Sequence, residues 1–221
     1  RNVNYTDLKG WRNYPLADPS SPAAGTPINW NTNFQNNPYW QLETNINTFD
    51  QDRITGSTFL NYKITDNFSV NGKLMLDHYS QRETLRNEKG SNENIDGYYA
   101  EIGRRYSEIN AETILSYSKS ITDDFSLTLN AGMNSMKRIS TRQLGELEGG
   151  LPGLFTLSNV KSGTTPNIDS DYTEQRINSV LGFGQLSYKN YAFLDFSGRN
   201  DWASVLPTKN NSFFYPAVSG S

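Results

Sequence analysis

Ile64-Thr65-Asp66-Asn67-Phe68-Ser69 recurs 57 residues later as Ile121-Thr122-Asp123-Asp124-Phe125-Ser126, and long segments of alternating apolar and polar residues flank both copies. Successive side chains of a strand point to opposite faces of a sheet. The motif therefore predicts a repeated β-hairpin whose arms each have one apolar and one polar face. The arms are more than twice as long as ordinary globular strands of about 5 to 6 residues. Crossing a bilayer takes about 9 to 11 residues, so arms of this length predict a transmembrane barrel.

The composition narrows the class of protein further. The chain is 35% hydrophobic with a mean hydropathy of -0.69, and it contains no apolar run of membrane-helix length, which excludes a helical membrane protein. A membrane barrel tolerates these values because half of each strand faces a polar lumen, although they also suit a soluble β-protein. A net charge of -3 gives no basic footprint for nucleic acid. The absence of cysteine excludes a disulfide framework and a thiolate metal site.

Aromatic residues make up 13% of the chain and gather near the ends of the alternating arms. Amphipathic rings favour the interfacial level of a bilayer. Their position beside the turns predicts part of an aromatic girdle, formed by Tyr62, Phe68, Tyr79, Tyr117, Phe125, Tyr188 and Tyr191.

Tight turns and long connections alternate along the chain. The two copies of the repeated turn and a third turn at Lys189-Asn190 fall on one side of the predicted sheet, and the long connections fall on the other. This sorting is typical of outer-membrane barrels, which have short periplasmic turns and long outer loops. The predicted fold is an all-β, antiparallel, up-and-down transmembrane β-barrel segment. Its predicted strands are 52–65, 68–82, 107–121, 125–139, 177–188, 191–202 and 213–221.

Residues 1–51 differ from the rest, because they are rich in Asn, Pro and Trp and show no sustained period. They predict an extracellular loop region, within which 40–50 fits either a short helix or an irregular strand. Seven strands cannot close a large barrel, and an open sheet in lipid leaves unpaired edges. We therefore expect a partial chain that is completed by further sequence or by a neighbouring chain.

Three strings resemble landmarks of the SusC/RagA-like TonB-dependent outer-membrane transporters. The most specific is SGRNDWASVLP at 197–207, which is followed by NSFFYPAVS at 211–219. NPYW at 37–40, with the strand that begins at Asp52-Arg53, resembles a second landmark in the same order. YKNY at 188–191 resembles the turn before the signature strand. The landmarks together span most of the chain.

The resemblance implies a large barrel of roughly 22 strands with a plugged lumen. It also implies an active importer of oligosaccharides or peptides in the outer membrane of a Gram-negative bacterium. A SusD-like surface lipoprotein would act as the lid, and TonB would supply the energy. Nothing in the chain resembles the plug domain, the TonB-contacting segment or the last barrel strand, so we expect the plug and the remaining barrel to lie outside it.

Two groups of residues are candidates for ligand contact. Asp195 and Arg199 share one strand face and are predicted to face the lumen, where charges tune selectivity. Flat aromatic rings with a polar edge dock sugars and peptide side chains well, although the same rings also pack long loops together. The aromatic candidates are Trp11, Tyr14, Trp30, Tyr39 and Trp40.

The sequence contains few residues suited to catalysis or to binding a cofactor. His78 is the only histidine, and it falls on an apolar face, where packing is its commoner role. No other histidine could serve as the base of a Ser-His-Asp triad, so we expect no enzyme activity. Gly182-Phe183-Gly184 lacks the third glycine of a nucleotide motif and indicates close packing or a bend. The loop 92–97 offers oxygen ligands for calcium but departs from EF-hand spacing, so we expect no cofactor beyond this minor calcium option.

A second class of protein fits part of the same pattern. A soluble, secreted β-sandwich or adhesin-type module whose loops bind glycans would also show alternating strands and polar loops. The two classes differ in the surroundings of the apolar face. In a membrane barrel, Leu60, Leu74, Leu115 and Leu129 would face lipid, with Asn61, Lys73 and Ser116 facing the lumen. In a sandwich, the same leucines would form the core.

Overall fold

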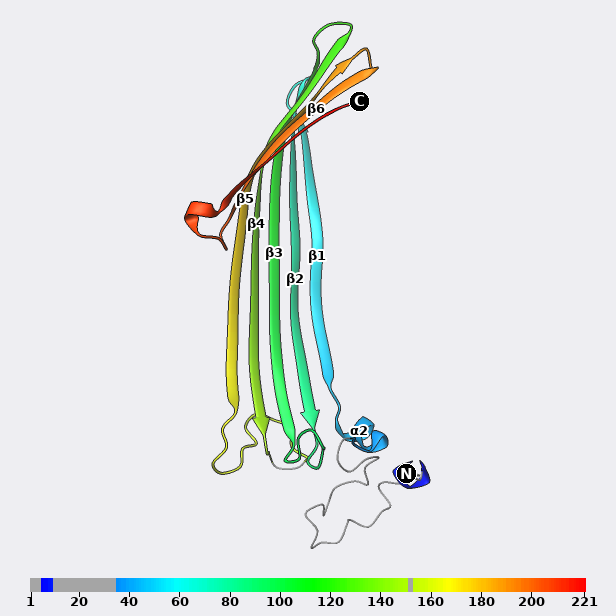
Figure 1. The fold of residues 1–221 in the computed structure, drawn as a ribbon, viewed down its shortest axis with the longest axis vertical. Coiled ribbons are helices and arrows are strands. Elements are labelled where there is room, and N and C mark those ends of the chain that lie inside the picture. Colours follow the sequence, from blue (N-terminus) through cyan, green and yellow to red (C-terminus); the bar gives the residue numbers. More distant parts are fainter. Residues whose placement is uncertain (1–4, 10–34, 151–152) are drawn as a thin grey trace. The chain divides into compact units, whose positions relative to one another are not determined.

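The computed structural model describes residues 5–9, 35–150 and 153–221. Seven strands form one antiparallel sheet in the order β1-β2-β3-β4-β5-β6-β7, so each strand lies beside its neighbours in sequence (Figure 1). This order confirms the predicted all-β, up-and-down fold class. The elements are α1 (Tyr5–Lys9), α2 (Pro38–Thr44), β1 (Thr48–Lys63), β2 (Phe68–Asn87), β3 (Tyr98–Ser120), β4 (Phe125–Glu148), β5 (Asn167–Tyr188), β6 (Ala192–Ala203), the 3-10 helix η2 (Thr208–Asn210) and β7 (Ser212–Gly220).

The repeated turn motif makes the same hydrogen bonds in both of its copies. The hydroxyl of Thr65 accepts from the backbone N–H of Asn67 and Phe68, and the hydroxyl of Thr122 accepts from the corresponding two residues. The third turn is built differently, because Lys189 and Asn190 both have positive φ, at 51° and 54°. Two positive φ values are the geometry of a type I′ hairpin turn, which matches the twist of the flanking strands.

Four strands are longer than the alternating pattern predicts. β2 and β4 continue to Asn87 and Glu148, while β3 and β5 begin at Tyr98 and Asn167. Polar residues are frequent on both faces of these extensions, so the apolar alternation that marks a strand is weak there. Ion pairs between neighbouring strands take its place. Arg104 Nη1, for example, lies 2.8 Å from Glu83 Oε2.

The segment 37–50 contains a helix followed by a strand. Asn37 caps helix α2, because its side chain accepts from the backbone N–H of Tyr39 and Trp40, and Pro38 occupies the first turn, where proline is favoured. Strand β1 then begins at Thr48, inside the region predicted as loop. The cap gives the string NPYW a structural reason that is independent of any family.

The described chain divides into two compact units, each described by itself. The turn-end unit comprises Arg53–Tyr79, Arg105–Ser140 and Tyr172–Ser221, and the loop-end unit comprises Arg1–Asp52, Ser80–Arg104 and Thr141–Asp171. Both repeated turns and the turn at Lys189 belong to the turn-end unit.

One face of the turn-end unit carries ladders of polar side chains. Asn61 Nδ2 donates to Asn71 Oδ1 at 2.6 Å, Asn71 Nδ2 donates to Ser116 Oγ at 3.5 Å, and the hydroxyls of Ser118 and Thr128 lie 3.2 Å apart. We call this face the polar face. The strands alternate, so the residues between these belong to the other face, the apolar face.

Large apolar side chains stand exposed on the apolar face, including Leu60 at 65%, Leu74 at 47%, Leu115 at 42% and Leu129 at 38%. Among the described residues, buried hydrophobic side chains are limited to Leu8, Trp40, Ala100, Ile102 and Leu147, which all lie in the loop-end unit. The turn-end unit therefore has no apolar core of its own. An apolar surface of this extent requires a lipid or protein covering.

Aromatic rings pair on the apolar face beside the short turns. The ring centroids of Phe68 and Tyr117 are 4.6 Å apart, and those of Phe125 and Tyr188 are 4.8 Å apart. Tyr79 does not belong with them, and its place in the predicted girdle is wrong. It stacks on Tyr106 with centroids 5.2 Å apart, because position 79 shares the polar face with Asp77.

None of the described helices is long and apolar enough to cross a membrane.

Candidate functional site

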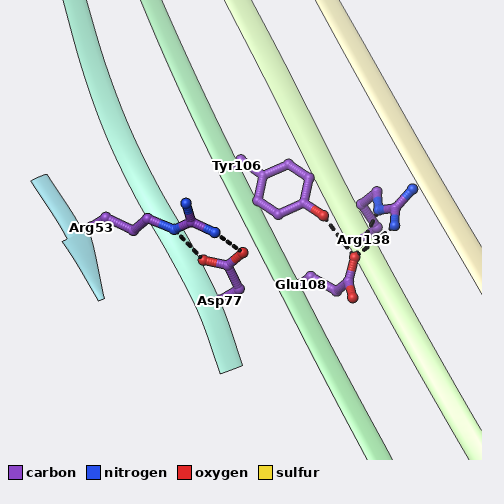
Figure 2. A network of polar contacts seen from close by, with 5 residues as sticks. All are labelled: Arg53, Asp77, Tyr106, Glu108 and Arg138. Atoms are coloured by element: carbon purple, nitrogen blue, oxygen red, sulfur yellow. Dashed lines mark hydrogen bonds and ion pairs between the residues drawn. The ribbon is translucent and has the colours of Figure 1, made fainter. Parts of the chain in front are cut away.

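The polar face of the turn-end unit carries a charged network, which Figure 2 shows across neighbouring strands. At its first centre, Arg53 of β1 faces Asp77 of β2. Arg53 Nε donates to Asp77 Oδ1 at 2.9 Å, and Arg53 Nη2 donates to Asp77 Oδ2 at 2.8 Å. Two parallel hydrogen bonds between a guanidinium and a carboxylate fix the orientation of both groups. The Arg53 side chain is 53% exposed, so the pair remains open to a ligand.

Glu108 of β3 is the second centre of the network. Its Oε2 accepts from the Tyr106 hydroxyl at 2.6 Å and from Arg138 Nε at 2.8 Å (Figure 2). The Arg138 guanidinium also lies 5.8 Å from the centre of the Tyr106 ring, within cation–π range. Tyr106 stacks on Tyr79 at an interplanar angle of 11°. The tyrosine pair and the Glu108–Arg138 ion pair thus hold one another in place.

A shallow hollow lies beside these groups on the same unit. It is lined by Thr55, Gly56, Ser57, Met75, Leu76, Asp77, Glu108 and Asn110. The carboxylates of Asp77 and Glu108 belong to both the hollow and the network. The surface therefore offers fixed charges of both signs, hydroxyl and amide groups, and two stacked aromatic rings.

The charged groups of the network are paired with one another. In the part of the chain that the structure describes, no group of three or more His, Cys, Asp or Glu side chains is placed to hold a metal ion. His78 neighbours Asp77 on β2, so it points to the apolar face, as the alternation predicts. The carboxylates in the network are already paired with arginines, which favours electrostatic recognition of a polar ligand.

Asp195 and Arg199 also lie on the polar side of strand β6, but with separate partners. Asp195 Oδ1 accepts from Gln185 Nε2 at 2.7 Å. Arg199 Nε donates to Asp201 Oδ1 at 2.7 Å, and Arg199 Nη2 donates to Ser179 Oγ at 3.0 Å. These contacts hold both side chains within their own sheet. A role for them in selectivity stays a prediction.

The five aromatic candidates divide into two groups. Trp11, Tyr14 and Trp30 lie outside the described residues. Tyr39 is half-buried, and Trp40 is only 4% exposed in helix α2, which favours packing as its role. Ligand contact by any of the five stays a prediction.

The loop 88–97 is tied to the segment before α2. Asn36 Nδ2 donates to Ser91 Oγ at 3.0 Å, and Asn36 Oδ1 accepts from the backbone N–H of Asn92 at 2.7 Å. Gly90 and Gly97 have positive φ, at 94° and 87°, so the loop turns where only glycine is unstrained. Calcium binding here stays a prediction.

The loop-end unit holds a tyrosine with a perturbed pKa. Tyr98 donates from its hydroxyl to Glu146 Oε2 at 3.0 Å, and Asn167 Nδ2 donates to Glu146 Oε1 at 2.8 Å. Partial burial, helped by this carboxylate, raises the pKa of Tyr98 to about 12. The hydrogen bonds from Asn167 and Tyr98 lower the pKa of Glu146.

We expect Tyr98 to ionise well above the ordinary tyrosine pKa of 10. Because its pKa is raised in the folded state, its stabilising contribution is complete below pH 10 and is lost as the pH rises through about 12. The measurement is the 295 nm absorbance of the intact protein minus that of Tyr98→Phe during an alkaline titration. A difference that titrates at pH 10 would contradict the buried hydrogen bond.

Sequence reasoning did not find the network. Its partners come from four strands, and their register across the sheet is not visible in a single segment. The signal that was available is the alternation itself, because Asp77, Glu108 and Arg138 all fall at polar-face positions of their strands.

Comparisons with known proteins give structural matches only. No family model and no curated protein matches the chain. The solved structures that match include the RagAB peptide transporter at a TM-score of 0.77, and the RagAB peptide importer in its "open-open" and "closed-closed" states at 0.76 and 0.77. The sequence identity is 17% in each case, and 89% to 90% of this chain is covered. The chain spans 22% of the length of each matched chain. The matches show that the sheet of this chain has the fold of part of those structures.

Proposed function

We propose that this chain is a barrel segment of an active importer in the outer membrane of a Gram-negative bacterium. The observation that carries the proposal is the two-sided sheet of the turn-end unit. Its apolar face exposes leucines such as Leu74, while side chains on its polar face form hydrogen bonds such as Asn61–Asn71. Lipid on one side and a wet lumen on the other satisfy both faces. The likeness in fold to the RagAB structures supports this assignment.

The secreted sandwich is less well supported by the same observation. A sandwich requires a second sheet packed at about 10 Å over the apolar face. The described strands belong to one sheet, and their leucines remain exposed. A glycan-binding module built from this chain alone would leave that surface in water.

The imported substrate is proposed to be a peptide. The network around Glu108 and Asp77 presents carboxylates and guanidiniums side by side, together with the stacked rings of Tyr79 and Tyr106. Peptides carry amines, carboxylates and aromatic side chains that complement all three. Neutral oligosaccharides would use the rings and bring no charge to the network.

The rest of the machinery follows from the SusC/RagA resemblance. The complete protein would close the barrel around a plug and open beneath a SusD-like surface lipoprotein, with TonB as its energy source. The network would then line the lumen and contact the substrate as it passes. This chain would supply one part of that wall.

We expect Arg138→Gln in the full-length protein to weaken uptake of labelled oligopeptides about five- to tenfold. A hydrogen bond to a charged group contributes roughly 1.5 kcal/mol when buried and less in a partly exposed site. The measurement is uptake by cells that express the transporter and its lipoprotein, with labelled oligosaccharides as the competing substrate class.

The matched control is Lys189→Gln, which removes one cation from a short turn outside the network. Its uptake should equal that of the unmodified protein. Preferential uptake of oligosaccharides would overturn the peptide assignment. Equal peptide uptake by both variants would show that the network does not contact the substrate as it passes.

A further inference from the structure

Along the apolar face of the turn-end unit, the side chains change from apolar to polar and charged with distance from the short turns. In β4 this face reads Phe125, Leu127, Leu129, Ala131 and Met133 away from the turn, and then Ser135 and Lys137. The other strands that flank this region change in the same way. β5 passes from Leu186 and Val180 to Arg176, and β3 passes from Leu115 and Ile109 to Arg105.

The orientation of these cations follows from their neighbours in sequence. Tyr106 and Arg138 meet at Glu108 on the polar face. Arg105 and Lys137, which directly precede them, therefore point to the apolar face. The Lys137 side chain is 41% exposed and that of Arg176 is 56% exposed.

Lys137 and Arg176 are grouped around one carboxylate. Arg176 Nε lies 2.8 Å from Glu174 Oε1, and Lys137 Nζ lies 3.5 Å from the same oxygen. Tyr172 donates to Glu174 Oε2 at 2.8 Å. Arg105 is exposed and makes no ion pair within the described part of the chain. Lys137, Arg176 and Glu174, which we call the boundary cluster, therefore carry a net positive charge.

The level of the boundary cluster matters if the apolar face meets lipid, as the proposed function requires. Charged side chains at the end of an apolar band lie in the headgroup region of the bilayer. Arg and Lys near an anionic lipid surface each contribute on the order of 1 kcal/mol of attraction. Guanidinium groups also bind phosphate oxygens in pairs.

We propose that the boundary cluster binds the phosphate groups of anionic lipids in the leaflet nearer to the long loops. Lys137 and Arg176 hold the phosphate, and Glu174 positions both cations. The occupant is a lipid rather than a free phosphate, because the apolar band directly beside the cluster receives the acyl chains.

The test uses the full-length protein in phosphatidylcholine vesicles that contain phosphatidic acid or diacylglycerol with the same acyl chains. These two lipids differ only in the phosphate group. Mass spectrometry of the lipids that remain with the purified protein gives the enrichment of each. We expect phosphatidic acid to be enriched over diacylglycerol, and Lys137→Gln with Arg176→Gln to reduce that enrichment on the order of tenfold.

Two further variants guard against a purely structural effect. Glu174→Gln removes the only negative charge of the cluster and should raise the enrichment, whereas Lys189→Gln, in the short turn after β5, should leave it unchanged. Equal retention of both lipids by an inserted, transporting protein would overturn the lipid site and leave the proposed function intact. Displacement of phosphatidic acid by millimolar inorganic phosphate would reassign the cluster to free phosphate. If the full-length protein failed to insert into the vesicles, both the lipid site and the proposed function would be contradicted.

Discussion

Leu74→Arg and Leu115→Arg are each expected to cost about 2 to 4 kcal/mol of barrel stability in lipid, the penalty for a cation at the bilayer midplane. Both leucines lie on the apolar face, where they are 47% and 42% exposed. They stand away from the short turns and from the boundary cluster, and so fall in the middle of the apolar band.

The matched controls are Lys73→Arg and Ser116→Arg, one position along each strand on the polar face. Lys73 already carries a charge over the Phe59 ring at 5.4 Å, and Ser116 accepts a hydrogen bond from Asn71. Both variants should lose much less than the leucine variants, because the lumen is wet. The measurement is urea unfolding of the full-length protein in vesicles.

A soluble sandwich would also be destabilised by arginine at position 74, since the residue would then lie in its core. A lipid-soluble photolabel separates the two cases. It should mark Leu74 and Leu115 in the membrane-inserted protein and should miss them in a sandwich. No labelling at either position of a correctly inserted preparation would remove the lipid-facing assignment.

The hairpins could be predicted from the sequence because their determinants are local. Thr65 and Thr122 close their turns with hydrogen bonds to residues two and three positions ahead, and alternation around them assigns each side chain to a face. Turn motifs and alternation can both be recognised within one short segment of the sequence. The strand order follows as well, since short turns join neighbours.

The strand extensions and the polar network could not be predicted in the same way. Around Glu83 and Arg104 both faces are polar, so the period of two carries no hydrophobic signal, and the strands are held by pairing between chain segments. The Glu108–Arg138 pair depends on the register between β3 and β4. Register is a property of two strands together and cannot be read from either strand alone.

The string Gly182-Phe183-Gly184 shows how far such reasoning extends. Its composition indicated close packing, and the structure places only one of its glycines in a tight site. A Cβ at Gly184 would lie 2.7 Å from Phe196 Cζ and 2.8 Å from both Leu129 Cδ2 and the Thr128 carbonyl oxygen. A Cβ at Gly182 would meet nothing nearer than 3.7 Å.

Gly184→Ala is therefore expected to destabilise the protein by about 1 to 3 kcal/mol, as overpacking does. The Phe196 ring can move, but the Thr128 carbonyl belongs to the backbone of the adjacent strand and cannot move without disturbing the sheet. Gly182→Ala, on the same face two residues away, should be neutral or stabilising by roughly 0.4 to 1 kcal/mol, because alanine restricts the unfolded chain more than glycine does. The opposite signs can be read from paired urea unfolding curves. If Gly184→Ala proved as stable as Gly182→Ala, the strands around position 184 would have to lie further apart than the structure shows.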